Sequence, residues 1–449
     1  MLCPNIGFLG VRLVKSIFIS ILFFSFLFEN LHAKSFISTG QKIDLKSAIL
    51  FATENSPDFD SLKRQLNVSE LEQQSAVARL LPSLDLTATH GIKDTSPRTN
   101  VGPWNSEFNL GLTESLYDNG VNLSNYRIAV LTKNQAEVNF QDQKNIIGLN
   151  IVSQFLAYSL NVKLLEIQDK QFKFVNKQHD LISRDYYQGI KTKKDFLRFK
   201  TQVNRSEIDL INAKNAVDKS RQELQKLIGI DLNSNIDVEF LPISLDNVEN
   251  EIADSLINLE QHLQHKSAQI QKEINQISSD LVARKNLPEW FISTGISYGS
   301  SNYLKTGQSL SDNGQVAWNA LLTVKYNFFD WGIRSRDREV AAQKNIIQSN
   351  ALDSTLLNLK SILNQLKINA QKIQKNYELA RELLSLEKNN IDFIEREYRN
   401  GKIQYLDLVI GLNDYSDAQI KFYTSASDLQ TARYTVLYHQ GKLYEELLK

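Results

Sequence analysis

The sequence predicts a mainly α-helical fold in which long antiparallel coiled-coil helices carry β-hairpins and one structural unit occurs twice. The duplication is visible because the second half of the 449-residue chain repeats residues of the first half at an offset of 212. Two prolines repeat at an offset of 206, so the copies differ in length within the hairpin, where a surface loop tolerates insertion. We expect a first repeat over 34–240 and a second over 241–449. The repeated pairs are Asp118/Asp330, Gly120/Gly332, Tyr186/Tyr398, Gly189/Gly401, Asp195/Asp407 and Gly229/Gly441, and the prolines are Pro82 and Pro288.

Residues 1–33 are expected to form a signal peptide. Arg12 and Lys15 precede an apolar run, 17–28, and Ala33 offers a small residue for cleavage. The run is short for a membrane-spanning helix, and a retained membrane anchor is the alternative. The single cysteine, Cys3, would leave with this segment, so the mature chain would contain no disulfide and no thiolate site.

The first repeat is expected to contain a helix over 45–80, a β-hairpin over 83–117, a long helix over 121–188 and a shorter helix over 191–227. Apolar and polar residues alternate in the hairpin, as in a strand with one apolar face. The long segment lacks proline and is rich in good helix formers, and Gly189 follows it where the chain must reverse. The Asp- and Asn-rich stretch 229–248 is expected to connect the two copies at mid-height.

The second repeat is expected to follow the same order, with a helix over 255–286, a β-hairpin over 289–329, a long helix over 333–400 and a helix over 406–447. Its last strand carries the clearest alternation of the chain, and we expect its apolar residues to share one face. These residues are Trp318, Ala320, Leu322, Val324, Tyr326 and Phe328.

Both long helices show apolar residues at a sustained spacing of three and four, which is typical of coiled-coil packing. At about 1.5 Å per residue, each helix would be on the order of 100 Å long. The two shorter helices of each copy together match the long one, so stacking them end to end would pair the long helix along its whole length.

The β-hairpins indicate contact with a membrane. No stretch after the N-terminal run is apolar enough for a transmembrane helix, so insertion would require a closed β-barrel. Four strands cannot close such a barrel, so several chains must contribute. A half-buried soluble sheet is the alternative interpretation. The tryptophans favour a membrane interface, because all four lie in or beside the hairpins: Trp104, Trp290, Trp318 and Trp331.

Composition argues against nucleic-acid binding and gives no support for catalysis. The chain has 51 basic and 51 acidic residues and no block of either sign, so no nucleic-acid partner is expected. We find no phosphate-binding loop, nucleophile motif or metal-ligand spacing, and we expect no enzyme activity, cofactor or metal. His262 and His265 lie three apart and could approach a metal, but we expect them to be surface residues.

Three pairs of segments carry a family resemblance: 81–83 with 287–288, 116–120 with 328–332, and 186–197 with 398–408. In their order, duplication and spacing, the chain resembles the TolC family of outer-membrane efflux proteins over essentially the whole mature sequence. The resemblance implies a homotrimer in the outer membrane of a Gram-negative bacterium, in which each chain gives four strands to one twelve-stranded β-barrel and four antiparallel helices to a periplasmic α-helical barrel. It also implies an export duct for small molecules or polypeptides in a tripartite efflux pump or type I secretion system, with a periplasmic adaptor protein and an inner-membrane ABC or proton-driven transporter as partners.

The resemblance also implies a gate at the periplasmic end. Tyr398 and Asp195 match a tyrosine and an aspartate that hydrogen-bond to hold the gate shut, and Asp407 matches an aspartate that lines the narrowest point. Ile403 and Ile410 stand where the family has further polar restraints, so fewer polar restraints are expected here. The tips at Gly189, Ile190 and Gly401 are expected to dock the adaptor. The rival interpretation is a periplasmic or surface coiled-coil structural protein without a channel.

Overall fold

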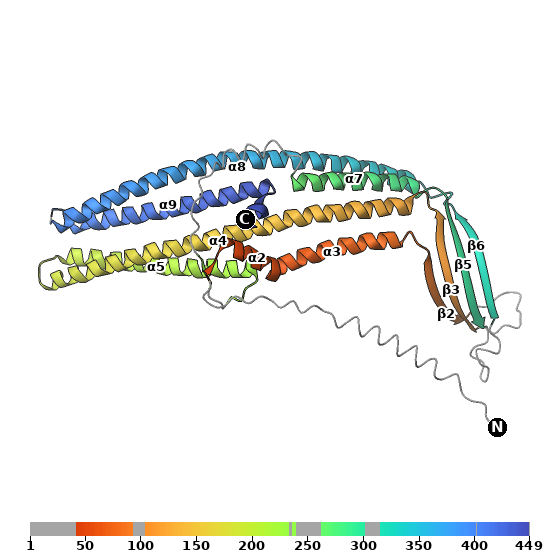
Figure 1. The fold of residues 1–449 in the computed structure, drawn as a ribbon, viewed down its shortest axis with the longest axis horizontal. Helices are drawn as coiled ribbons and strands as arrows, with labels where there is room; N and C mark the ends of the chain where they lie inside the picture. Colours follow the sequence, from red (N-terminus) through yellow and green to blue (C-terminus); the bar gives the residue numbers. More distant parts are fainter. Residues whose placement is uncertain are drawn as a thin grey trace, which may run out of the picture. The chain divides into compact units, whose positions relative to one another are not determined.

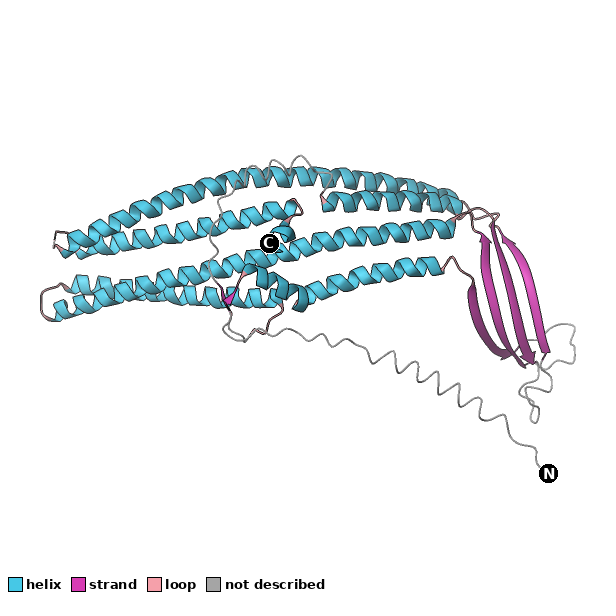
Figure 2. Ribbon diagram, viewed as in Figure 1, coloured by secondary structure: helices cyan, strands magenta, loops and turns pink. Residues whose placement is uncertain are grey.

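The computed structural model describes residues 42–92, 104–232, 236–238, 262–300, 315–400 and 402–448. The part described is mainly helical and contains one four-stranded antiparallel sheet (Figure 2). The expected signal peptide, 1–33, and Gly401 lie outside the described residues, and so does the side chain of Trp104. The structure confirms a mainly helical fold with β-hairpins.

Two 67-residue helices dominate the fold, α4 (Val121–Tyr187) and α8 (Ile333–Arg399). Each begins after a left-handed glycine, Gly120 or Gly332. The carboxylate of Asp118 accepts hydrogen bonds from the backbone N–H groups of residues 120 and 122, at 2.9 and 2.6 Å. Asp330 makes the same pair of contacts in the second copy, at 3.1 and 3.0 Å. The duplicated Asp-x-Gly motif therefore starts each long helix by satisfying its first free N–H groups.

Shorter helices flank the long ones. These are α2 (Leu45–Asn55), α3 (Pro57–Ala78), α5 (Lys193–Ile228), α7 (Leu263–Arg284), α9 (Tyr405–His439) and α10 (Leu443–Leu448). We call α4 with α5 the first helical hairpin, and α8 with α9 the second (Figure 1).

The structure corrects two expected helices. The helix expected over 45–80 is interrupted at Ser56, because Pro57 cannot continue a helix through its missing N–H and starts α3 instead. The helix expected over 406–447 is interrupted at Gly441, which adopts a left-handed φ of +71°. Of the helix expected from residue 255, the described part begins at Leu263.

The four strands form one sheet in the order β2-β3-β5-β6. They are β2 (Ser83–Ile92), β3 (Trp104–Tyr117), β5 (Glu289–Ser300) and β6 (Gln315–Lys325). The two hairpins join through β3 and β5, so strands from different copies pair with each other. Because β6 ends at Lys325, Tyr326 and Phe328 do not continue the alternating face that the sequence predicted.

The register places large apolar residues in one row across the sheet. Leu86 pairs with Leu110, Leu110 with Ile296, and Ile296 with Trp318. All four side chains are exposed in the single chain. The outermost strands β2 and β6 have no further partner among the described residues.

The helices form two four-membered rows that share α4 and α8. On the side of the sheet, α3, α4, α7 and α8 contact one another in this order, and toward the reversing turns the order is α5, α4, α9, α8 (Figure 1). In both rows α8 is one edge, and α3 or α5 is the other. Between the rows, a two-stranded parallel pair, β1 (Lys42–Ile43) and β4 (Asp237–Val238), holds the connector. Tyr158 supports it by donating a 2.7 Å hydrogen bond to the Ile236 carbonyl.

Candidate functional site

The reversing turns of the two helical hairpins share a backbone hydrogen bond that closes a six-residue loop. After α4, Gly189 has a φ of +77°, and the Ile190 N–H donates a 2.8 Å hydrogen bond to the Asp185 carbonyl. After α8, the Lys402 N–H donates to the Glu397 carbonyl at 3.0 Å. This six-residue closure is the Schellman motif, which ends a helix at a left-handed residue. It leaves Ile190 67% exposed at the tip.

The two aspartates expected in the gate begin the return helices. The Asp195 carboxylate accepts a 2.7 Å hydrogen bond from the Thr192 hydroxyl, and the Asp195 N–H donates to that hydroxyl at 3.2 Å. Asp407 likewise accepts a 3.2 Å hydrogen bond from the Gln404 N–H. Both residues are the third helical residue of a capping box. The hydrogen bond from Thr192 lowers the pKa of Asp195 below its usual value.

The expected hydrogen bond between Tyr398 and Asp195 does not occur among the described residues. The carboxylate of Asp195 is turned toward the N-terminus of its own helix, where the orphan N–H groups are. Tyr398 instead packs edge-on against Tyr405, with ring centroids 5.7 Å apart. In the single chain, a capping partner three residues away takes the carboxylate that was expected to meet the distant hydroxyl, and the gate role of Tyr398 and Asp195 stays a prediction.

An apolar cluster holds this end of the helices together instead. Phe199 of α5 and Tyr405 of α9 meet edge-to-face across the two hairpins, with ring centroids 4.2 Å apart. The Tyr405 hydroxyl is buried and has no hydrogen-bond partner among the described residues, and burial raises its pKa. We call the buried set the tip cluster: Ile182, Phe199, Ile391, Tyr405, Leu408 and Val409.

Sequence reasoning missed the tip cluster and named only two neighbouring isoleucines, Ile403 and Ile410, as positions without a polar restraint. Ile410 is exposed and Ile403 is half-buried, and neither belongs to the cluster. The spacing of Tyr405, Leu408 and Val409 by three and four was the signal that could have identified the buried face. Asp407 lies on the exposed side of the same helix.

Titratable residues meet between the two rows of helices. The Tyr438 hydroxyl donates a 3.2 Å hydrogen bond to Asp142, and His262 and His439 lie with ring centroids 6.4 Å apart. Burial, with a smaller effect of His262, lowers the pKa of His439 to about 4. His265 is only 3% exposed, so the prediction that it is a surface residue was wrong. The described residues contain no group of three or more side chains that could hold a metal ion.

The aromatic residues expected at a membrane interface are exposed where their side chains are described. Trp290 pairs with Tyr117 and Val324, Trp318 lies in the apolar row, and Trp331 follows the sheet. Trp331 has a φ of +57°, which is unfavourable for a bulky residue, and its ring packs against Phe329 at 4.9 Å. None of the described helices has the length and hydropathy needed to cross a membrane.

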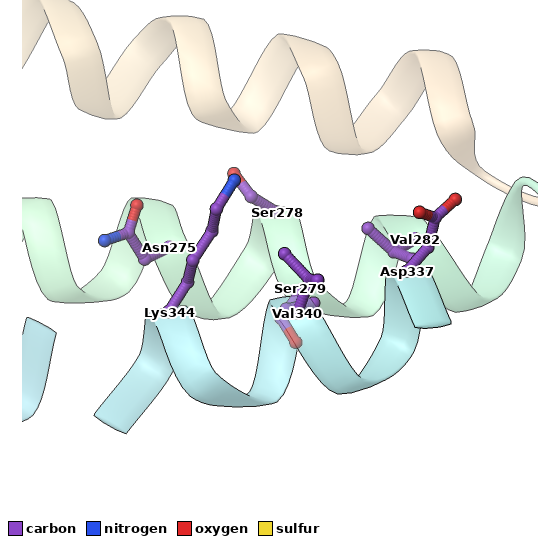
Figure 3. Close-up of a pocket in the computed structure, with 8 residues that line it drawn as sticks. Asn275, Ser278, Ser279, Val282, Asp337, Val340 and Lys344 are labelled. Carbon is purple, nitrogen blue, oxygen red and sulfur yellow. The ribbon is translucent and has the colours of Figure 1, made fainter. Parts of the chain in front are cut away.

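A groove of about 220 Å³ lies between α7 and α8. Figure 3 shows Asp337 and Lys344 of α8 at its two ends, with Asn275, Ser278 and Ser279 of α7 along the other wall. Seven residues of helix separate the two charged side chains, which is about 10 Å along the axis.

Residues 50–230 match the family described as outer membrane efflux protein. One relative is the alkaline protease secretion protein AprF of Pseudomonas aeruginosa, 23% identical over 190 residues. The match covers 40% of this chain and spans only 39% of that relative.

Solved structures share the fold over most of the chain. The outer membrane protein VceC of Vibrio cholerae is 16% identical with a TM-score of 0.71, covering 88% of this chain and 95% of its own. The Campylobacter jejuni CmeC outer membrane channel is 14% identical with a TM-score of 0.74, covering 92% and 93%. The open-state MtrE outer membrane channel of Neisseria gonorrhoeae is 16% identical with a TM-score of 0.67, covering 90% and 89%. The resemblance drawn from the sequence is thus confirmed: residues 50–230 are similar to the outer membrane efflux protein family, and the solved structures share the fold of this chain.

Proposed function

We propose that this protein is an outer-membrane export duct of a Gram-negative bacterium, with its sheet in the membrane and its helices in the periplasm. The observation that carries the proposal is the exposed row Leu86, Leu110, Ile296 and Trp318, which runs across all four strands. Large apolar side chains at this density are costly in water and favourable against lipid. The relatives named as outer membrane channels support the same location.

The assembly that we propose is a homotrimer. A sheet with two unpaired outer strands, β2 and β6, can close only if β2 of one copy pairs with β6 of the next, and three copies would give twelve strands. Each helical row also has two different edges, with α8 on one side and α3 or α5 on the other. Unlike edges that meet head to tail close into a ring. The outer face of α8 supports this because it exposes apolar residues, among them Ile347, Leu357, Ile368, Leu379 and Phe393.

The tips are the proposed docking site of a periplasmic adaptor, which would connect the duct to an inner-membrane ABC or proton-driven transporter. The first tip exposes Tyr187, Ile190 and Leu197, and an apolar surface of this kind at a helix turn fits a protein partner. The second tip lacks the excess of basic residues that surrounds the first. The basic residues of the first tip are Lys191, Lys193, Lys194, Arg198 and Lys200. The relative named for alkaline protease secretion supports polypeptide export by a type I system, and small molecules are the other cargo class.

In the trimer, three copies of Asp407 would surround the duct near its narrow end. Like carboxylates around one axis attract cations. Asp407→Asn should therefore lower the cation selectivity of single channels in planar bilayers. Asp195→Asn is the matched control, because it alters the same capping-box position in the other copy.

Channel activity of the purified protein tests the function. We expect ion-conducting channels from detergent-extracted protein, and reduced cation selectivity for Asp407→Asn but not for Asp195→Asn. A protein that is soluble without detergent and forms no channel is the coiled-coil structural protein instead. Equal selectivity of both variants and the parent would place Asp407 away from the duct.

A further inference from the structure

A partly buried polar contact joins the two helical hairpins away from their tips. The Gln171 side chain of α4 donates from Nε2 to Asn413 Oδ1 at 2.8 Å, and its Oε1 accepts from the Ser416 hydroxyl at 2.9 Å. Asn413 and Ser416 are on α9, Ser416 is buried, and the other two residues are half-buried. Both ends of the Gln171 amide are thus satisfied by the opposite hairpin.

This contact is unusual for its place in the fold. Another described hydrogen bond between α4 and α9, from Tyr438 to Asp142, lies far up the same helices. Below Gln171 the hairpins meet through the apolar tip cluster. The position that corresponds to Gln171 in the second copy is Leu383, so the duplication does not explain the glutamine.

We propose that Gln171, Asn413 and Ser416 form a clasp that restrains separation of the two helical hairpins and so sets the energy of opening the duct. Apolar side chains tolerate sliding past one another, whereas the half-buried Gln171 amide must break two directional hydrogen bonds together. Separation also leaves the three polar groups without partners until water reaches them. The role in opening rests on the proposed function, and the restraint itself does not.

The test compares Gln171→Leu with Gln154→Leu. Gln154 is the matched control because it is half-buried on the same helix and donates at 3.3 Å to the Ser220 carbonyl within the first hairpin. We expect Gln171→Leu to raise the open probability of single channels about tenfold, equivalent to about 1.4 kcal/mol, and Gln154→Leu to leave it unchanged. Asn413→Leu should match Gln171→Leu, and the double variant should add little, because either change breaks the clasp.

A distance measurement separates failure of the clasp from failure of the channel. Spin labels at Lys194→Cys and Leu406→Cys, in a Cys3→Ser background, report the spacing of the tips whether or not the protein conducts. Gln171→Leu should broaden this distance distribution and Gln154→Leu should not. Ser416→Ala, which removes one bond and little volume, should have a smaller effect of the same sign and covers the case in which the leucine variant misfolds. An unchanged distribution in Gln171→Leu and Ser416→Ala, or equal broadening in Gln154→Leu, would overturn the proposal.

Discussion

At the scale of single residues, the positions repeated in both copies are mostly those that begin or end helices. Asp118 and Asp330 start the long helices, and Asp195 and Asp407 complete capping boxes. Gly189, Gly229 and Gly441 all have left-handed φ values near +75° and are followed by the same six-residue closure. The residues repeated in both copies therefore mainly define where helices begin and end. Other residues make the contacts between the helical hairpins.

Tyr405 makes a contact between the two helical hairpins, and its contribution to stability can be measured. Its hydroxyl is buried in the tip cluster without a described partner. Because an unsatisfied buried hydroxyl costs free energy, Tyr405→Phe should stabilise the protein by up to about 1 kcal/mol. Thermal unfolding in one detergent measures this as a higher Tm than the parent.

Tyr398→Phe is the control for Tyr405→Phe. The Tyr398 side chain is half-buried, and its hydroxyl makes no described hydrogen bond to Asp195. Removing this hydroxyl should therefore change the Tm little. A clear loss of stability in Tyr405→Phe would mean that the hydroxyl has a partner in the assembled protein, and the tip cluster would then not be purely apolar.

At the scale of elements, glycine at a helix end can serve the turn alone or the packing as well. Gly189 and Gly229 share a φ of +77°. A Cβ on Gly189 would meet nothing within 4 Å, whereas a Cβ on Gly229 would lie 2.5 Å from the Asn55 carbonyl oxygen. The end of α5 therefore fits against the end of α2 only without a side chain, and this close approach positions the connector.

The pair of alanine variants separates the two costs. Gly189→Ala should lower the free energy of unfolding by about 1 kcal/mol, which is the strain of a left-handed alanine. Gly229→Ala should lower the free energy of unfolding by at least about 2 kcal/mol more, because backbone atoms must move to relieve the overlap of the new Cβ with the Asn55 carbonyl. Unfolding midpoints in detergent measure both. Equal losses for the two variants would mean that α2 and α5 separate easily at this point.

At the scale of the whole molecule, the single chain is incomplete. Its sheet has two unpaired outer strands, and α8 exposes an apolar face along much of its length. In the proposed trimer this face would be buried against α3 and α5 of the neighbouring copy, which explains why the chain can expose so many large apolar residues.

Charge on the outer face of α8 tests this assembly. Leu357→Glu and Ile368→Glu should each weaken the trimer at least about tenfold, because an unpaired carboxylate is costly in an apolar interface. Lys367→Glu, which changes an exposed polar position one residue from Ile368 and therefore about 100° away around the helix, should not. Mass determination in mild detergent over a dilution series measures the trimer fraction. A parent protein that is monomeric at all concentrations contradicts the assembly.

The sequence by itself was sufficient for the fold class, because the signals that define it are local. Helical spacing, strand alternation, the Asp-x-Gly motif and the turn glycines act over a few residues, and each is satisfied by backbone hydrogen bonds near it. For the candidate gate, the sequence could indicate the region of the chain but not the contacts that its residues make. Which partner Asp195 takes, which aromatic ring meets Phe199, and which residues satisfy the Gln171 amide depended on tertiary structure. The pairing of β3 with β5 joins strands whose partners are roughly 180 residues apart. Such contacts are decided by the packing of several elements at once, whereas at Asp195 a nearby capping partner took the carboxylate that a distant tyrosine was expected to bind.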